Sequence, residues 1–252
     1  MERNCAVILD LFAAAGVQAT FFTLGWVAER HADLLRRIAA AGHELASHGW
    51  DHIRVFKLDA RSFAADVERS RKAIEDAAGV AVRGYRAPSF SIDARTPWAH
   101  AVLAEQGFAY SSSVAPIVHD HYGWRDAPRF PFRPVPGSNL LEVPVTTVEI
   151  GNRRLAAGGG GFFRVLPYRF SRWAIRQVNG REGRPAVFYF HPWEIDPAQP
   201  RVADAPLRSR LRHYTNLEGM ADKLRRLLAD FAWGRMDALV ARELTRAEAV
   251  AA

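Results

Sequence analysis

The 252-residue sequence has a single cysteine, Cys5, and only three lysines. A lone cysteine excludes an internal disulfide and any cysteine-rich zinc site, so a metal would have to be bound by histidines and carboxylates. The most apolar stretch, residues 6–28, is interrupted by Asp10, Gly16 and Gln18, and no basic segment precedes it as in a signal peptide. These absences predict a chain without a membrane span and a cytoplasmic location.

Positive charge predominates, but it is not concentrated in one place. The net charge of +7 rests mainly on arginines that are scattered along the chain. Proteins that bind nucleic acid usually gather basic residues on one face, so the pattern predicts no nucleic acid partner. A solvated basic surface accounts for the charge, and attraction to an acidic polysaccharide or an anionic membrane is the alternative. The sequence leaves the oligomeric state open.

Helical patterns alternate with short apolar runs along the chain. This alternation predicts an α/β fold with a parallel sheet. The expected helices cover residues 2–15, 27–42, 60–78, 97–107, 167–179 and 217–231, and the expected strands cover 19–24, 44–47, 82–86, 109–112, 141–147 and 186–190. Because such folds begin with a strand and this chain begins with a helix, the first β-strand is expected to be missing.

Two segments are expected to be loops. The run Gly158 to Gly161 is not a phosphate-binding loop, because no Gly-Lys-Ser/Thr follows it, and flexibility is the expected property. Arg208, Arg210 and Arg212 are expected on a solvated basic turn, with contact to an anionic glycan as the alternative.

Two histidines lie four residues apart directly after an expected strand. His48 and His52 can converge on one metal ion, although a polar turn is the alternative. A catalytic zinc takes three protein ligands and keeps a position open for water, so a carboxylate is still required. Arg86 and His191 follow other expected strands, and parallel α/β sheets place their functional residues at these strand ends.

Three segments resemble motifs of polysaccharide deacetylases with the NodB homology domain, the carbohydrate esterase 4-like family. Residues 42–52, 84–91 and 188–194 resemble the second, third and fifth motifs in order and spacing. Further segments resemble the branch associated with exosortase/PEP-CTERM exopolysaccharide clusters, and these are residues 119–123, 158–164 and 212–217. Together the resemblances cover nearly the whole chain.

The resemblance implies a distorted (β/α) barrel and a divalent metal, zinc first of all, held by two histidines and one aspartate. It implies that His48 and His52 are metal ligands and that His191 protonates the departing amine. It further implies that Arg86 orients the aspartate base and that the Ser89 N–H helps to hold the oxyanion. The implied partner is an N-acetylated polysaccharide.

Several side chains near the motifs are expected to contact this substrate. Aromatic rings stack on sugars, although ordinary packing in the core or within a loop is the alternative. The expected contacts are Trp50, Phe90, His119, Tyr122 and Trp193 in addition to Ser89, and His121 is a further candidate.

The sequence also departs from the family pattern. The first motif, which carries the family's base and ligand aspartates, has no counterpart, so an N-terminally truncated chain is expected. Residues 111–114, all serine except Val114, stand where an aspartate and a tryptophan are usual, which predicts a different environment for His191. In place of the missing aspartate, Asp51 or Asp93 is expected to approach Arg86, with solvation of Arg86 by water as the alternative.

Two functions are consistent with these observations. One is a metal-dependent hydrolase that removes N-acetyl groups from an exopolysaccharide, and the other is a non-catalytic glycan-binding pseudoenzyme. The predicted organisation is a deacetylase region at 1–116, a family-specific half that completes the barrel at 117–240, and a tail at 241–252. Association with a membrane-bound exopolysaccharide assembly system is an alternative to a purely cytoplasmic location.

Overall fold

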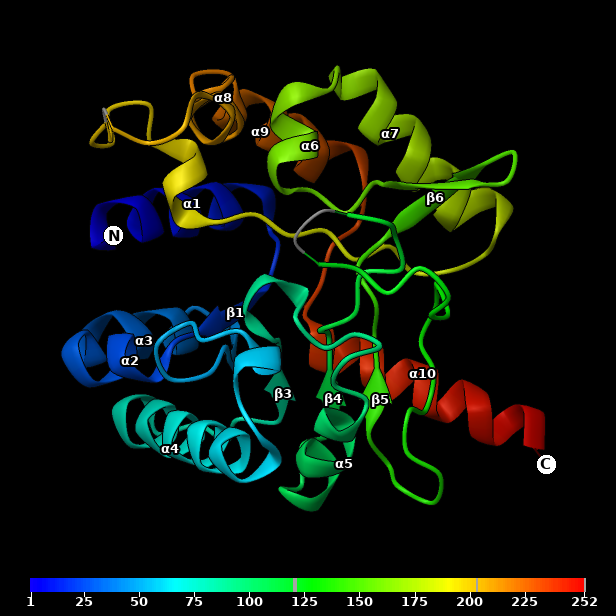
Figure 1. The fold of residues 1–252 in the computed structure, drawn as a ribbon. Coiled ribbons are helices and arrows are strands. Elements are labelled where there is room, and N and C mark those ends of the chain that lie inside the picture. Colours follow the sequence, from blue (N-terminus) through cyan, green and yellow to red (C-terminus); the bar gives the residue numbers. More distant parts are fainter. Residues whose placement is uncertain (120–121, 203, 252) are drawn as a thin grey trace. The chain divides into compact units, whose positions relative to one another are not determined.

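The computed structural model describes residues 1–119, 122–202 and 204–251, and it contains two compact units (Figure 1). The sheet unit consists of Gln18–Val145 and Gly234–Ala252. The helical unit consists of Met1–Val17 and Thr146–Trp233. Each unit is therefore assembled from two separate stretches of the chain.

A parallel sheet of five strands organises the sheet unit, and it confirms the predicted α/β class. The strand order follows the sequence, and each neighbouring pair is parallel. The strands are β1 (Thr20–Thr23), β2 (Glu44–Ser47), β3 (Gly84–Tyr85), β4 (Tyr110–Ser111) and β5 (Leu141–Glu142). Among the residues described, these strands form an open sheet rather than a closed barrel. Because all strands run the same way, their carboxyl ends meet at one edge.

The helices of the sheet unit include α4 (Ala60–Ala78), which has the bounds that the sequence predicts. Asp59 caps its first turn by accepting a hydrogen bond from the Ser62 N–H, and Gly79 ends it with a φ of 70°. The remaining helical segments are α2 (Gly25–Arg30), α3 (Ala32–Ala40), η1 (Val55–Lys57), η2 (Pro88–Phe90), α5 (Trp98–Glu105) and α10 (Met236–Ala251). The single helix expected at 27–42 is wrong, because His31, with a φ of −132°, separates α2 from α3.

The helical unit begins with α1 (Glu2–Ala15), again with the predicted bounds, and Gly16 ends it in the left-handed conformation. Its other elements are the antiparallel pair β6 (Thr147–Ile150) and β7 (Arg153–Ala156), α6 (Gly160–Val165), α7 (Tyr168–Arg176), η3 (Gln177–Arg181), η4 (Pro192–Ile195), α8 (Leu207–Tyr214) and α9 (Met220–Asp230).

Two expected strands are wrong. The run 141–147 divides into β5 and β6 on either side of Pro144, whose missing N–H cannot join a ladder. The run 186–190 forms only an isolated bridge, between Tyr189 and Gly159. Short apolar runs do not separate a strand from an extended buried segment by composition alone.

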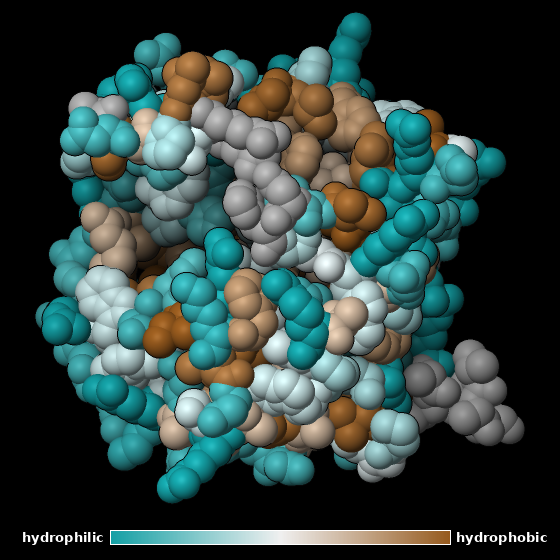
Figure 2. Space-filling view, in the orientation of Figure 1, coloured by the Kyte–Doolittle hydropathy of each residue, from teal (hydrophilic) through white to brown (hydrophobic). Residues whose placement is uncertain are grey.

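Two expected loops are helical. Helix α6 begins inside the glycine run, at Gly160, and α8 includes Arg210. Figure 2 shows apolar side chains in separate areas among hydrophilic ones on the face it presents. None of the helices described is long and apolar enough to cross a membrane.

A buried acid–base pair joins β5 to α5. The Glu142 Oε2 lies 3.0 Å from the His100 Nε2, and the Glu142 Oε1 accepts hydrogen bonds from the N–H groups of Ser113 and Val114. Burial by itself raises the pKa of Glu142, but the hydrogen bond and charge of His100, together with hydrogen bonds from Ser111 and Val114, outweigh burial, so the pKa is lowered from its ordinary 4.5. Ionised Glu142 therefore stabilises the folded chain.

We expect the Glu142–His100 pair to make the stability of the folded chain depend on pH. Because the pKa of Glu142 is lower in the folded chain, its stabilisation is present above about pH 4.5 and is lost as the pH falls through the folded value. In urea unfolding of the wild type, the free energy of unfolding should therefore decrease below about pH 4.5. In Glu142→Gln this free energy should be lower by about 1–3 kcal/mol at neutral pH, and it should depend less on pH. Glu149→Gln, on the exposed side of β6, is the control, and equal pH dependence in wild type and Glu142→Gln would contradict the assignment.

Candidate functional site

Polar residues follow neighbouring strands at the carboxyl edge of the sheet. His48 follows β2, Arg86 follows β3 and Ser112 follows β4. The His48 N–H donates to the carbonyl of Thr23, and the Arg86 N–H donates to the carbonyl of Ser47 at 2.9 Å. The ladder thus continues past the regular strands and fixes these residues side by side.

The structure brings the two motif histidines together. The ring centroids of His48 and His52 are 5.2 Å apart, and the rings are inclined at 70°. The His48 Nδ1 lies 2.7 Å from the carbonyl oxygen of Arg86, to which it donates. A backbone carbonyl bound at one ring nitrogen is the usual way of orienting a metal-binding histidine, so His48 would bind a metal through Nε2.

The loop between these histidines is held by the helices beneath it. The N–H groups of Gly25 and Trp26, at the start of α2, donate to the carbonyls of Gly49 and Trp50. The Asp66 carboxylate on α4 accepts from the Trp50 N–H at 3.2 Å. Burial raises the pKa of Asp66 to about 6, although the hydrogen bond from Trp50 opposes the shift. Sequence reasoning missed Asp66, because nothing in a helical pattern marks it.

The backbone conformation of this loop also restricts its residues. Gly49 has a φ of 78°, and a Cβ placed on it would lie 2.9 Å from the Asp66 Oδ2. Trp50 is half-buried, with the Arg69 guanidinium 3.4 Å from its ring centroid. A Cβ on Gly25 would lie 2.5 Å from the Trp50 ring, so the indole packs closely on α2. The structure therefore gives Trp50 packing contacts within the sheet unit.

Arg86 is buried at the end of β3 and is only 8% exposed. Its Nε donates to the Ser112 carbonyl at 2.9 Å, and its Nη2 donates to the Ser112 hydroxyl at 2.7 Å. The guanidinium also lies 4.1 Å from the ring centroid of Phe22 and 5.5 Å from that of Phe90. The expectation that Asp93 approaches Arg86 is wrong, because the Asp93 carboxylate is bound by Arg95.

Unusual backbone geometry gathers at the predicted motifs. The described non-glycine residues with positive φ are His52, Ser89, Phe90 and Asn216. Left-handed non-glycine residues cost of order 1–3 kcal/mol each and concentrate at functional sites. All four residues lie in segments that the sequence analysis selected, which supports a functional role for the segments.

A row of rings continues from Phe90. The Phe90 and Tyr122 centroids are 5.8 Å apart, and Tyr122 stacks on His119 at 4.1 Å with an interplanar angle of 21°. The structure thus places three of the predicted substrate contacts together in the sheet unit. His121, the other histidine considered at the sequence level, lies outside the described residues.

In the helical unit, His191 is held by a carboxylate three residues later. The Glu194 Oε1 accepts from the His191 N–H and lies 2.9 Å from the His191 Nδ1. The Glu194 Oε2 accepts from the Arg164 Nε at 2.7 Å. Glu194 is 0% exposed and Arg164 is 2% exposed, whereas the His191 side chain is 47% exposed. A buried ion pair therefore supports an accessible histidine.

The electrostatic consequence is a carboxylate that stays ionised. Burial alone raises the pKa of Glu194, but the hydrogen bond and charge of His191, together with Arg164, lower the pKa from its ordinary value. The Arg164 Nη1 also donates to the carbonyls of His213 and Thr215 at 2.8 Å. Since an ionised carboxylate accepts only, the His191 Nδ1 carries the proton between them.

Trp193 lies in a stack of rings beside this pair. Its centroid is 5.7 Å from that of His191 and 4.0 Å from that of His213, with interplanar angles of 18° and 14°. The Arg164 guanidinium lies 5.0 Å from the same ring. Burial, followed by the charge of Arg164, lowers the pKa of His213.

The glycine run positions Arg164, and this role explains why the run consists of glycine. A Cβ on Gly159 would lie 2.0 Å from the Tyr189 carbonyl oxygen, and Gly159 and Gly160 both have positive φ. The Gly160 N–H donates to the Tyr189 carbonyl at 2.9 Å, which ties the start of α6 to the residues before His191. The run is therefore a site of close backbone approach rather than a flexible loop.

The donor set fits part of a metal site. Two imidazoles, one oriented by a carbonyl, are suitable ligands for zinc. In the part of the chain that the structure describes, no group of three or more histidine, cysteine, aspartate or glutamate side chains is arranged to hold a metal. A third ligand is thus not beside His48 and His52 among those residues.

Two family models match successive parts of the chain. Residues 1–110 match the polysaccharide deacetylase family model, and residues 112–241 match the family described as domain of unknown function DUF3473. A chitooligosaccharide deacetylase from Rhizobium leguminosarum bv. trifolii is 39% identical over 70 residues, 28% of this chain and 33% of that protein. A peptidoglycan deacetylase from Helicobacter pylori is 30% identical over 107 residues, 42% of this chain and 36% of that protein. The matches therefore span about a third of each curated relative.

The fold is similar to that of solved structures. The crystal structure of a candidate polysaccharide deacetylase from Mycobacterium smegmatis superimposes with a TM-score of 0.62 at 25% sequence identity. The match covers 97% of this chain and 77% of that one. The likeness extends through both family segments.

Proposed function

Because this chain belongs to the DUF3473 family and carries a polysaccharide deacetylase domain at residues 1–110, we propose that it serves in the metal-dependent removal of N-acetyl groups from an exopolysaccharide. The observation that carries the proposal is the pair His48 and His52, with His48 oriented by the Arg86 carbonyl. The segments 119–123, 158–164 and 212–217, which resemble that branch, support the proposed relation to exosortase/PEP-CTERM exopolysaccharide clusters.

The sheet unit supplies the metal-binding part of the proposed chemistry. His48 and His52 would hold a divalent ion, and zinc commonly takes imidazole ligands. When bound, the ion supplies Lewis-acid activation of the acetamido carbonyl and of water. The Ser89 N–H, in a segment of left-handed backbone, would donate to the oxyanion that develops on the acetyl group.

The helical unit supplies the proton donor. His191 would protonate the departing amine, and a positioned acid of this kind contributes about a hundredfold to ten-thousandfold in rate. Glu194 holds the His191 Nδ1 proton, so the proton delivered to the amine would come from Nε2. Arg164 keeps Glu194 in place and ionised.

Aromatic rings are proposed to receive the sugar units. Phe90, Tyr122 and His119 form one row in the sheet unit, and Trp193 is partly exposed in the helical unit. Arg86 would hold Phe90 in position, because it contacts Ser112 and the rings of Phe22 and Phe90.

A second function is favoured by one observation. Among the described residues, no carboxylate joins His48 and His52 in a three-ligand metal site. A glycan-binding pseudoenzyme needs neither this ligand nor a carboxylate base. Under the enzymatic proposal, these carboxylates belong to a first-motif strand. We define the completed chain as residues 1–252 preceded by such a strand. The strand would be taken from the gene upstream of Met1 or grafted from a relative.

Zinc titration tests the metal-binding part. Two imidazoles without a carboxylate hold zinc loosely, so calorimetry should show weak binding to residues 1–252, lost in His48→Ala. His31→Ala, which alters a histidine between α2 and α3, should bind as the wild type does. Tight binding that survives His48→Ala would exclude this pair as the ligands.

A further inference from the structure

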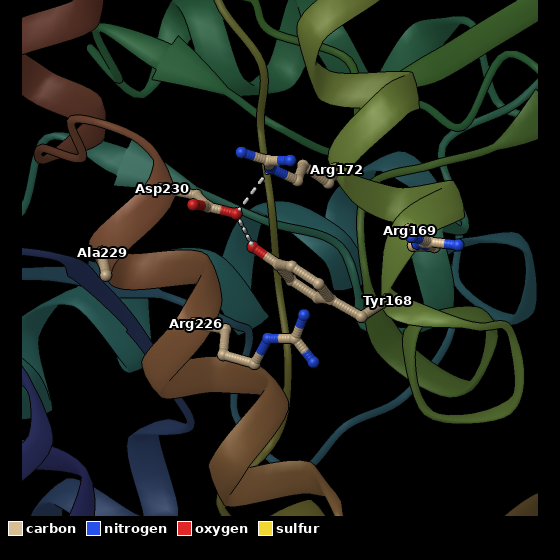
Figure 3. A pocket seen from close by; sticks show the side chains of 6 residues that line it. All are labelled: Tyr168, Arg169, Arg172, Arg226, Ala229 and Asp230. Carbon is tan, nitrogen blue, oxygen red and sulfur yellow. Dashed lines mark hydrogen bonds and ion pairs between the residues drawn. The ribbon is translucent and has the colours of Figure 1, made fainter.

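Arginines line a hollow between α7 and α9 of the helical unit (Figure 3). Arg169 and Arg172 come from α7, and Arg226 comes from α9. Tyr168 forms the floor, and Asp230 lies opposite at the end of α9. The lining therefore contains three guanidinium groups and one carboxylate, which leaves an excess of two positive charges in this arginine hollow.

Part of the arginine hollow is fixed by its own contacts. The Tyr168 hydroxyl donates to the Asp230 Oδ2, and the Arg172 Nε lies 2.8 Å from the same oxygen, as Figure 3 shows. Burial and the hydrogen bond to Asp230 raise the pKa of Tyr168, so the hydroxyl keeps its proton. The hydrogen bond from Tyr168, followed by the charges of Arg172 and Arg176, lowers the pKa of Asp230. Asp230 therefore stays ionised and holds Arg172 in place.

The other two arginines carry the excess charge. The Arg226 guanidinium lies 4.3 Å from the ring centroid of Tyr168, which fixes its position without neutralising it. Among the residues described, no carboxylate lies within ion-pair distance of Arg169 or Arg226. A guanidinium presents parallel N–H donors that match the two oxygens of a carboxylate. The hollow is thus suited to an anionic group with that geometry.

An exposed aromatic ring on the same helix points to a sugar. Trp173 is 39% exposed, follows Arg172 directly and lies four residues after Arg169, hence on the same side of α7. Exposed indole rings offer an apolar face on which a sugar ring can stack. An arginine cluster on the same helix as such a ring offers the two kinds of contact that an acidic sugar requires.

We propose that the arginine hollow binds the carboxylate of a uronic acid unit in a glycan. The proposal rests on the proposed function in taking a glycan as the ligand, and it narrows the substrate class to acidic N-acetylated polysaccharides. Helix α9 also carries Lys223, whose Nζ donates to the carbonyls of Phe163 and Arg164. The same helix therefore supports both the hollow and the arginine that holds Glu194.

Binding of a defined oligosaccharide tests the proposal without requiring catalysis. The probe is a hyaluronan hexasaccharide, which alternates N-acetylglucosamine with glucuronate, titrated calorimetrically into residues 1–252 at low salt. Arg226→Gln should weaken binding by about tenfold to a hundredfold, as expected for loss of one charge-assisted contact. Arg225→Gln is the matched control, because Arg225 is the neighbouring arginine and pairs with Asp222. Arg226→Lys should bind with intermediate affinity.

The remaining arms distinguish the ligand class and the site. Chitohexaose, which is neutral, should bind equally to the wild type and Arg226→Gln. Equal weakening by Arg225→Gln and Arg226→Gln would reduce the effect to general surface charge and overturn the proposal. Binding to phosphatidylglycerol vesicles that depends on Arg226, with no binding of hyaluronan, would also overturn it in favour of a membrane surface. Absence of acetate release by the completed chain, with hyaluronan binding intact, would count against the proposed function and leave this site standing.

Discussion

Replacement of Glu194 by alanine is expected to lower the free energy of unfolding by about 3–5 kcal/mol. The reason is that Arg164, 2% exposed, would keep its charge while losing its carboxylate partner at 2.7 Å. The two backbone carbonyls that accept from the Arg164 Nη1 do not neutralise that charge. Urea unfolding at neutral pH measures the loss.

Matched variants separate the contribution of the Glu194–Arg164 ion pair from the effect of removing any glutamate. Glu218→Ala removes an exposed glutamate of the same unit and should change stability by less than about 0.5 kcal/mol. Glu194→Ala combined with Arg164→Met should recover part of the loss, because the second change removes the uncompensated charge. Similar stabilities for Glu194→Ala and Glu218→Ala would show that the buried pair contributes little.

Replacement of His191 by alanine in the completed chain is expected to lower kcat for deacetylation by about a hundredfold to ten-thousandfold. The amine is a poor leaving group until it is protonated, and His191 is the exposed imidazole whose Nδ1 is held by Glu194. KM should change little, since a proton donor acts mainly in the transition state. Acetate release from an N-acetylglucosamine oligomer is the readout.

The leaving group provides a second arm of this experiment. An aryl acetate releases a phenolate that needs no proton, so His191→Ala should slow its hydrolysis far less than it slows deacetylation. His213→Ala removes a ring from the same stack and should lower kcat by less than about tenfold. Equal loss of both activities in His191→Ala would remove His191 as the acid and leave it a structural role.

The sequence predicted elements that carry their own boundary signals. The bounds of helices α1 and α4 were predicted correctly. Gly16 and Gly79 end these helices in the left-handed conformation, and their apolar residues recur at helical spacing. The α/β class followed from the same alternation. The segment before His191 was predicted as a strand and is not one, because its apolar side chains pack around a backbone that contacts the glycine run.

Contacts between distant residues could not be predicted in this way. Arg164 reaches Glu194 across 30 positions, and the glycine run that places Arg164 resembles a flexible loop when it is considered without its neighbours. Asp66 supports the Trp50 N–H from the middle of an ordinary helix. Glu194 had a local signal, since a glutamate three residues after His191 fits a capping box at the start of η4. Its role depends on the buried arginine, which only the structure shows.

Acetate release by residues 1–252 and by the completed chain, measured side by side with zinc and an N-acetylglucosamine oligomer, tests the central claim most directly. The claim is that His48, His52 and His191 belong to a deacetylase whose ligand and base carboxylates are not among the residues described. We predict negligible release by residues 1–252, because loss of a positioned base alone costs about a hundredfold to ten-thousandfold, and clear release by the completed chain. Full activity in residues 1–252, or no activity in a completed chain that binds zinc tightly, would contradict it.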